Sequence, residues 1–258
     1  MESRLAFLSP PSPCEYLPDR DWQLHYEVVQ RATPAEYMER LEQGWRRFGH
    51  VLFRPRCPSC DACWSLRVPV SSFRPNRSQR RAWNVNRRDV TIRIGQPSAT
   101  VEKIQLFEQY HRHQHVVRQW PPTAAHDLER FTDNPFPTEE WCYYTGDRLI
   151  AVGYVDVLPA GLSAIYFYYD PQQRQRSLGT YNVLAIIDAA RQRNVPHVYL
   201  GYYVKGCGSL EYKARFRPNE VLKADGAWRP LHLDPESTLI EEARDHDPDG
   251  GVQHREEE

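Results

Sequence analysis

The hydrophobic and polar positions of the chain predict a succession of short strands and helices. Residues 162–169 alternate between two faces and are rich in tyrosine and phenylalanine, which is typical of a β-strand. Asp170 and Pro171 end this strand, and apolar residues then recur at helical spacing from Leu178 to Asp188. We expect Ser177 to cap that helix, so the stretch is predicted to be a strand, a basic loop and a helix.

Similar patterns divide the rest of the chain. The other predicted strands lie at 22–30, 50–56, 64–70, 141–144, 149–158 and 197–203. A capping box at Thr33 begins one helix, Ser78 is expected to cap a short basic helix, and a third helix is predicted over 100–115. The apolar side of the third helix is expected to use Val101, Ile104 and Phe107, and to extend to Val116.

These elements predict an α/β (α+β) protein in two parts. The strands at 162–169 and 197–203 flank a helix, which favours parallel pairing in a mixed central sheet. A Gly- and Pro-containing segment at 94–99 is the expected boundary between an N-terminal domain (1–95) and a C-terminal domain (100–235). The acidic residues 236–258 are expected to form a disordered tail.

The net charge of −1 conceals a strongly basic segment. Between Arg67 and Arg93 the chain carries eight arginines and a single acid, Asp89. Such a segment favours a polyanion, and interleaved aromatic residues favour RNA with unpaired bases over duplex DNA. Arg77, Arg80 and Arg81 are the candidate RNA contacts, while a solvated arginine face is the plainer interpretation.

The loop before the predicted helix at 178–188 is a second candidate anion site. Arg174, Arg176, Ser177 and Gly179 lie where a helix N-terminus presents free backbone amides and a positive dipole end. This arrangement is typical of the acyl-donor site in acetyltransferase-like folds, although the second small residue of the usual loop is absent. An ordinary strand–turn–helix unit with solvated arginines is an equally good interpretation of the loop alone.

Cysteine spacing suggests a metal site. Cys57, Cys60 and Cys63 fall within seven residues, and Cys14 in the proline-rich entry is the natural fourth ligand for zinc or an iron–sulfur cluster. The alternative is a set of reduced thiols that pack a loop. No signal peptide or membrane-length apolar run is found, so we expect a soluble, cytoplasmic protein.

Several motifs in one order resemble the arginyl-tRNA–protein transferases. The N-terminal motifs are Cys14-x-Tyr-Leu-Pro18, Gly44-Trp-Arg-Arg-Phe-Gly49, Arg54-Pro-x-Cys57-x-x-Cys60 and Phe73-Arg-Pro-x-Arg-Ser-Gln-Arg80. The C-terminal motifs include Asp156-Val-Leu-Pro159, Tyr169-Asp-Pro171, Ser177-Leu-Gly179, Tyr199-Leu-Gly-Tyr202 and Tyr212-Lys213. The short length and the lack of a second cysteine after Cys14 are similar to the bacterial branch, the aspartate/glutamate leucyltransferases.

This resemblance implies a fold, a reaction and partners. It implies a GNAT-like (acetyltransferase-like) C-terminal domain in which aminoacyl-tRNA replaces acetyl-CoA. The reaction it implies moves leucine from leucyl-tRNA to proteins with an N-terminal Asp or Glu, which marks them for the N-degron pathway. No cofactor is required for such a transfer.

We expect the site residues to divide into three groups. Arg174 and Arg176, with the amides near Ser177 and Gly179, would hold the tRNA 3′ end. The reacting centre would be formed by Tyr166, Tyr202, Lys213 and Asp156. Arg46 or Arg47 would pair with the acidic side chain of the acceptor.

Three rival interpretations stay open at the level of sequence. The first keeps the enzyme class and changes the amino acid to arginine. The second is a CoA-dependent acetyltransferase. The third is a non-catalytic RNA-binding module with a cysteine-bound metal. His111 and His115, one helical turn apart, are interpreted as surface histidines.

Overall fold

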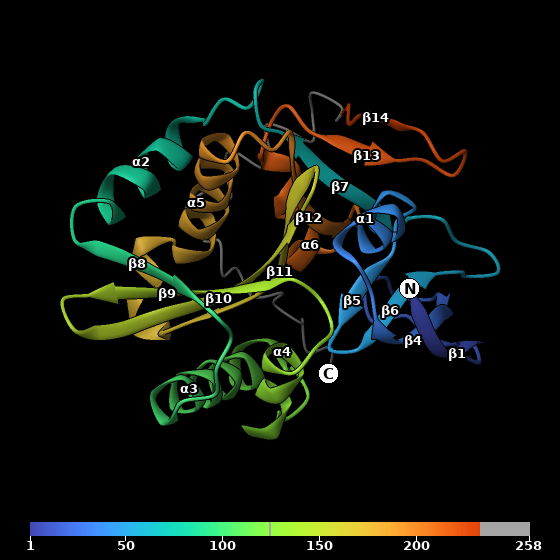
Figure 1. Cartoon of the computed structure of the whole chain (residues 1–258), viewed down its shortest axis with the longest axis horizontal. Coiled ribbons are helices and arrows are strands. Elements are labelled where there is room, and N and C mark those ends of the chain that lie inside the picture. The colour runs from blue at the N-terminus through green and yellow to red at the C-terminus, as the bar shows by residue number, and fades with distance from the viewer. Residues whose placement is uncertain (124, 233–258) are drawn as a thin grey trace, which may run out of the picture.

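A computed structural model of the chain describes residues 1–123 and 125–232 (Figure 1). An eight-stranded sheet crosses the molecule, and a four-stranded sheet lies at one end of it. The order in the large sheet is β14 (Trp228–Pro230), β13 (Glu220–Leu222), β7 (Trp64–Pro69), β12 (His197–Tyr203), β11 (Gly161–Tyr169), β10 (Arg148–Leu158), β9 (Thr138–Thr145) and β8 (Val90–Gly95). The order in the small sheet is β1 (Glu2–Leu8), β4 (Leu24–Arg31), β6 (Val51–Pro55) and β5 (Arg46–Phe48). β2 (Ser12–Pro13) and β3 (Asp21–Trp22) form a separate pair.

Helices cover both faces of the large sheet. α2 (Arg77–Asn86) and α5 (Leu178–Gln192) lie on one face, and α3 (Val101–Arg118) with α4 (Glu129–Thr132) lies on the other (Figure 1). α1 (Pro34–Glu42) packs between the small sheet and β10. The remaining short helices are η1 (Ala125–Leu128), η2 (Pro171–Arg176), α6 (Gly208–Glu211) and η3 (Tyr212–Arg215). The predicted α/β (α+β) class with a mixed central sheet is confirmed.

The helix starts follow local capping chemistry. The capping box at Thr33 is confirmed, because the Glu36 amide donates to the Thr33 hydroxyl and the Thr33 amide donates to the Glu36 carboxylate. The predicted Ser78 cap is wrong, since the basic helix begins two residues earlier. Its N-cap is Asn76, whose side-chain oxygen accepts from the Gln79 amide at 2.8 Å.

The helix predicted over 100–115 is α3, and its apolar side is shorter than expected. Phe107 is buried and Ile104 is half-buried against the aromatic core beneath the helix. Val101 is 71 % exposed and Val116 is 76 % exposed, so their assignment to the apolar side is wrong. Both lie in an end turn of the helix, and the buried residues lie between them.

β11 and β12 form a wedge, and this is the feature of the fold that positions the site. The predicted parallel pairing is confirmed, but it covers only Gly161–Ser163 opposite His197–Tyr199. Beyond these residues, β12 continues along β7, with a register shift between Tyr199 and Gly201. Gly201 has a φ of +85°, a conformation that favours glycine. The unpaired edge of β11 therefore faces an opening whose closed end lies near Ser163.

The two expected domains share one sheet. β7 and β8 come from the predicted N-terminal part, yet they are hydrogen-bonded into the large sheet beside strands of the second half. The division at 95–100 stays a prediction. The expected tail at 236–258 lies outside the described residues. No helix within residues 1–123 and 125–232 is long and apolar enough to cross a membrane.

Candidate functional site

Arg46 closes the narrow end of the wedge. It extends from β5, the edge strand of the small sheet, and its guanidinium donates to the Ser163 hydroxyl at 3.0 Å and to the Ala164 carbonyl at 2.7 Å. The side chain is 7 % exposed. These two acceptors are neutral, so they hold the guanidinium in place without cancelling its charge. The structure thus sets a buried cation where β11 leaves β12.

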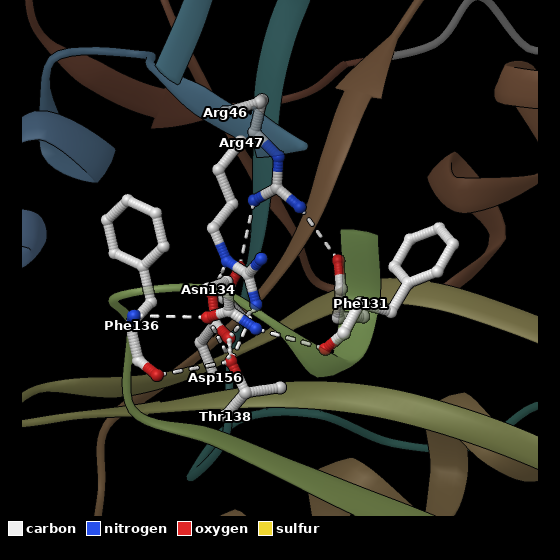
Figure 2. Close-up of polar contacts among 9 residues, drawn as sticks. Arg46, Arg47, Phe131, Asn134, Phe136, Thr138 and Asp156 are labelled. Carbon is white, nitrogen blue, oxygen red and sulfur yellow. Dashed lines mark hydrogen bonds and ion pairs between the residues drawn. The ribbon is translucent and has the colours of Figure 1, made fainter. Parts of the chain in front are cut away.

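Arg47 has a different environment from its neighbour. Its guanidinium donates to both carboxylate oxygens of Asp156 at 2.6 Å, and to the Thr138 hydroxyl at 2.7 Å (Figure 2). Both charged side chains are fully buried. Burial alone would lower the pKa of Arg47, but the Asp156 carboxylate raises it above its ordinary value. This geometry disfavours direct contact of Arg47 or Asp156 with a substrate, because each group already has its partner.

Lys213 lies beside Arg46 on the β12 side of the wedge. Its ammonium group donates to the Tyr202 carbonyl at 2.8 Å. A Cβ atom added at Gly201 would lie 3.5 Å both from the Lys213 nitrogen and from the Arg46 guanidinium, so the two cations flank this glycine. Burial, and then the nearby charge of Arg46, lower the pKa of Lys213 to about 7. The Lys213 amine is therefore available as a base near neutral pH.

The two predicted tyrosines differ in position. The Tyr202 hydroxyl donates to the Gly44 carbonyl at 2.9 Å and to the Phe53 carbonyl at 3.2 Å, which joins β12 to the small sheet. Tyr202 therefore contributes its backbone carbonyl to Lys213, while its hydroxyl is used for packing.

Tyr166 faces the helix α3 instead. Its hydroxyl lies 2.7 Å from the Nε2 atom of His111, and its ring stacks on Phe131 with centroids 4.5 Å apart. Burial lowers the pKa of His111, which favours the neutral ring. The interpretation of His111 as a surface histidine is wrong. The signal for its burial was the spacing of four residues from Phe107 on the apolar side of the helix.

The predicted donor loop forms an uncapped helix start. The expected capping role of Ser177 is wrong, since this residue adopts a left-handed conformation (φ 52°, ψ 49°) and its side chain makes no capping hydrogen bond. Side-chain capping therefore does not occupy the first amides of α5. A Cβ atom added at Gly179 would meet nothing within 4 Å, so a ligand can approach the backbone there.

Two distant segments meet at this loop. Arg176 in η2 forms a forked ion pair with Asp89, with N–O distances of 2.9 and 2.7 Å. Asn86 at the end of α2 donates to the Arg176 carbonyl at 2.7 Å. Arg174 is exposed on the same short helix. A cavity of about 580 Å³ opens beside these residues, between η2 and the end of α2.

The arginines of α2 point outward, as a polyanion site requires. Arg77, Arg80 and Arg81 are all exposed, whereas Gln79, Ala82 and Asn86 make up the buried side of the helix. α2 packs on α5 and contacts η2, so the helix that carries these exposed arginines lies beside the donor loop (Figure 1). The structure therefore brings together the elements of two predicted anion sites that are separated in sequence.

The four cysteines do not present the expected metal site. Cys14, Cys57, Cys60 and Cys63 are half-buried free thiols. Burial, and then the neighbouring thiols of Cys57 and Cys14, raise the pKa of Cys63 to about 12. No group of three or more His, Cys, Asp or Glu side chains in the described part of the chain is arranged to hold a metal ion.

Comparison with known structures supports the fold. FemX covers 92 % of this chain and 90 % of its own length, with a TM-score of 0.51 and 8 % identity. At this identity the likeness concerns the fold alone. The mixed sheet and the overall fold are therefore FemX-like, and the GNAT-like assignment of the second half stays a prediction.

Sequence comparison identifies the family. Residues 12–81 match the family described as "Arginine-tRNA-protein transferase, N terminus", and residues 102–223 match "Arginine-tRNA-protein transferase, C terminus". An aspartate/glutamate leucyltransferase of Nitrosococcus oceani is 38 % identical over 228 residues, which are 87 % of this chain and 95 % of the relative. The protein of that name from Pseudomonas fluorescens is 36 % identical over 85 % of this chain and 94 % of its own length. The chain therefore belongs to the arginine-tRNA–protein transferase family, in its group of aspartate/glutamate leucyltransferases.

Proposed function

We propose that this protein transfers leucine from leucyl-tRNA to proteins whose N-terminal residue is Asp or Glu, which marks them for degradation. The observation that carries the proposal is the wedge between β11 and β12. Its narrow end holds Arg46 and Lys213, and the uncapped start of α5 with its arginines follows the far end of β11. A cationic inner end suits an acidic acceptor, and a cationic outer loop suits the phosphates of tRNA.

The tRNA would lie along the outer loop and α2. Arg174 and the amides of Ser177 to Gly179 would hold the 3′ end, and Arg77, Arg80 and Arg81 would contact phosphates farther along. Arg176 would stay beside them in its ion pair with Asp89. This order leaves the aminoacyl ester pointing into the wedge. When the enzyme holds the ester and the amine side by side, their bimolecular reaction becomes effectively unimolecular.

The chemistry is the aminolysis of an ester. The α-amine of the acceptor attacks the leucyl carbonyl, a new C–N bond forms, and the bond to the ribose oxygen of tRNA breaks. Lys213 accepts the proton that the amine loses and returns it to the ribose oxygen, which leaves as a hydroxyl. The pKa of Lys213 near 7 suits this exchange, because a base works best when its pKa lies near the operating pH. The atoms balance without a metal or a redox partner.

Arg46 would recognise the acidic side chain of the acceptor. Two of its nitrogens already donate to Ser163 and Ala164, and the remaining N–H groups can reach a carboxylate. We assign Arg47 and Asp156 a positioning role instead, because their mutual ion pair fixes the strand that carries Arg46. Tyr202 also has a positioning role, because its backbone carbonyl accepts a hydrogen bond from the Lys213 amine.

The test is a transfer reaction without ATP. A Glu-initiated peptide is incubated with the protein and with leucyl-tRNA, arginyl-tRNA or acetyl-CoA in separate reactions. A mass gain of one leucine residue, from leucyl-tRNA alone, is the expected result. A gain of arginine or of an acetyl group would replace the proposal by the corresponding rival, and a Gln-initiated peptide serves as the control for acceptor choice.

A further inference from the structure

A second hollow lies outside the wedge and shares only Arg80 with the tRNA contacts proposed above. It lies between α2 and α5 and has a volume of about 300 Å³, at the lower end of the range of about 300–1,000 Å³ common for ligand sites. Phe73, Leu184 and Ile187 are buried at its base, and the half-buried Trp83 forms a wall. Trp83 is held by Tyr181, with ring centroids 5.5 Å apart. The hollow is therefore an apolar groove with a fixed aromatic side.

Polar and charged groups stand on the rim of the groove. Arg80 and Asn84 come from α2, and Asp188 and Arg191 come from α5. Arg80, Asn84 and Arg191 are exposed, while the Asp188 carboxylate accepts from the Gln192 amide at 2.7 Å and keeps further lone pairs. The rim thus offers two cations, one amide and one carboxylate above an aromatic wall.

This combination matches an unpaired nucleotide. A base stacks on an indole ring, its exocyclic amino group donates to a carboxylate, and its phosphates pair with guanidinium groups. The surroundings also favour a polyanion, since Arg74, Arg77 and Arg81 are exposed on the same segment. The acid of this segment, Asp89, is already paired with Arg176.

The groove is continuous with the proposed tRNA site. The C-terminal end of α2 borders the cavity of about 580 Å³ at the donor loop, and the middle of the same helix borders the groove. α2 also packs along α5 and against η2. A strand of RNA that enters the donor loop can therefore follow α2 directly to Trp83.

We propose that the groove between α2 and α5 binds one unpaired base of the tRNA, stacked on Trp83, with its amino group on Asp188 and flanking phosphates on Arg80 and Arg191. The inference rests on the proposed function, because it takes leucyl-tRNA as the RNA. It adds a base-reading contact outside the wedge and favours a cytosine or adenine over a uracil, which has no amino group.

The test uses the full chain and four variants. Trp83→Leu removes the stacking ring, Asp188→Ala removes the acceptor, and Arg191→Ala removes a rim cation. Arg112→Ala is the matched control, since Arg112 is an exposed arginine on α3, across the sheet. Leucyl-tRNA binding is measured against salt concentration, and the trinucleotides CCA and UUA are compared by tryptophan fluorescence.

The groove variants are expected to bind leucyl-tRNA more weakly than wild type, each to a different extent. Trp83→Leu weakens leucyl-tRNA binding at least fivefold, Arg191→Ala lowers the slope of log affinity against log salt by about one, and Arg112→Ala changes neither. Wild type binds CCA more tightly than UUA, and Asp188→Ala loses this preference. The melting midpoint of each variant shows whether the fold is kept, and Arg191→Ala alters only an exposed side chain.

Two failures can be told apart. If wild type transfers leucine and the groove variants bind leucyl-tRNA as wild type does, the groove inference is overturned and the proposed function stands. If wild type transfers no leucine, the proposed function fails, and binding of CCA through Trp83 decides the groove separately. A change confined to KM for the acceptor peptide would also overturn the inference, because the groove would then bind protein.

Discussion

Two adjacent arginines have opposite chemical uses. Arg46 donates to a hydroxyl and a carbonyl, whereas Arg47 is neutralised by Asp156. A buried guanidinium with neutral partners attracts an anion, and one already paired with a carboxylate resists it. The difference arises because the two side chains leave β5 toward different strands of the large sheet, Arg46 toward β11 and Arg47 toward β10.

The charge of Arg46 is expected to select the acceptor. Arg46→Gln should lower kcat/KM for a Glu-initiated peptide by about 10- to 100-fold, the cost of one charge-assisted hydrogen bond. The activity toward a Gln-initiated peptide should change far less. Arg40→Ala, a cation of α1 that pairs with Glu27, is the control. An unchanged ratio of the two kcat/KM values would remove Arg46 from acceptor recognition.

Lys213 should make stability depend on pH. Its pKa is about 7 in the folded protein and about 10.4 in the unfolded chain. Between these values the unfolded state binds more protons, so the free energy of unfolding should rise as the pH increases from 7 to 10. Below pH 7 Lys213 is protonated in both the folded and the unfolded state, so the buried charge lowers the free energy of unfolding by its full amount.

The comparison with Lys213→Met isolates this effect. The variant lacks the titrating group, so its advantage over wild type should be greatest below pH 7 and shrink toward pH 10. Urea unfolding at several pH values measures both curves. Parallel curves would show that Lys213 keeps an ordinary pKa, and the assignment of Lys213 as the base would lose its support.

At the level of elements, α2 depends on its start. The Asn76 side chain accepts from the Gln79 amide, and the Gln79 side chain accepts from the Asn76 amide at 2.9 Å. The Gln79 amide group also donates to the Arg215 carbonyl at 3.1 Å, which ties α2 to η3. The basic helix is therefore held by its first turn as well as by its packing on α5.

Asn76→Ala should destabilise the protein by about 1 kcal/mol, as loss of an N-cap usually does. Ser78→Ala is the matched control, because Ser78 donates to the Asn76 side chain but caps no helix amide. Urea unfolding gives the free energies, and hydrogen exchange reports on the first turn of α2. Equal effects of the two substitutions would contradict the capping role of Asn76.

At the level of the whole molecule, the two sheets are joined through buried polar groups. The Arg47–Asp156 pair links β5 to β10, and the Tyr202 hydroxyl links β12 to carbonyls of the small sheet. α1 fills the space between the sheets with Tyr37, Met38 and Leu41. The wedge is therefore shaped by contacts between the sheets as well as within them.

Removal of one partner of the buried ion pair should lower the free energy of unfolding more than replacement of both partners. Arg47→Met or Asp156→Leu alone should destabilise the protein by about 3–5 kcal/mol, because a charge is left buried without its partner. The double variant should be more stable than either single variant. Urea unfolding of the four proteins yields the coupling energy, and strictly additive effects would argue against a mutual pair.

Local sequence patterns were enough to predict most of the helices and strands. The capping box at Thr33 and the strands around Thr145-Gly-Asp147 depend on residues within a few positions of one another, so they could be predicted. The family motifs, the parallel pairing of β11 and β12 and the basic segment were also apparent.

Only the packing of the folded chain determined which of the candidate residues contact one another. Arg47 and Asp156 are 109 positions apart, Asn86 and Arg176 are 90 apart, and His111 and Tyr166 are 55 apart. Periodicity and capping depend on residues close together in the chain. Neither pattern predicts which buried arginine forms an ion pair with a carboxylate. Because burial and partner choice follow from the packing of the sheets and helices, only the folded chain leaves Arg46 available and Arg47 paired.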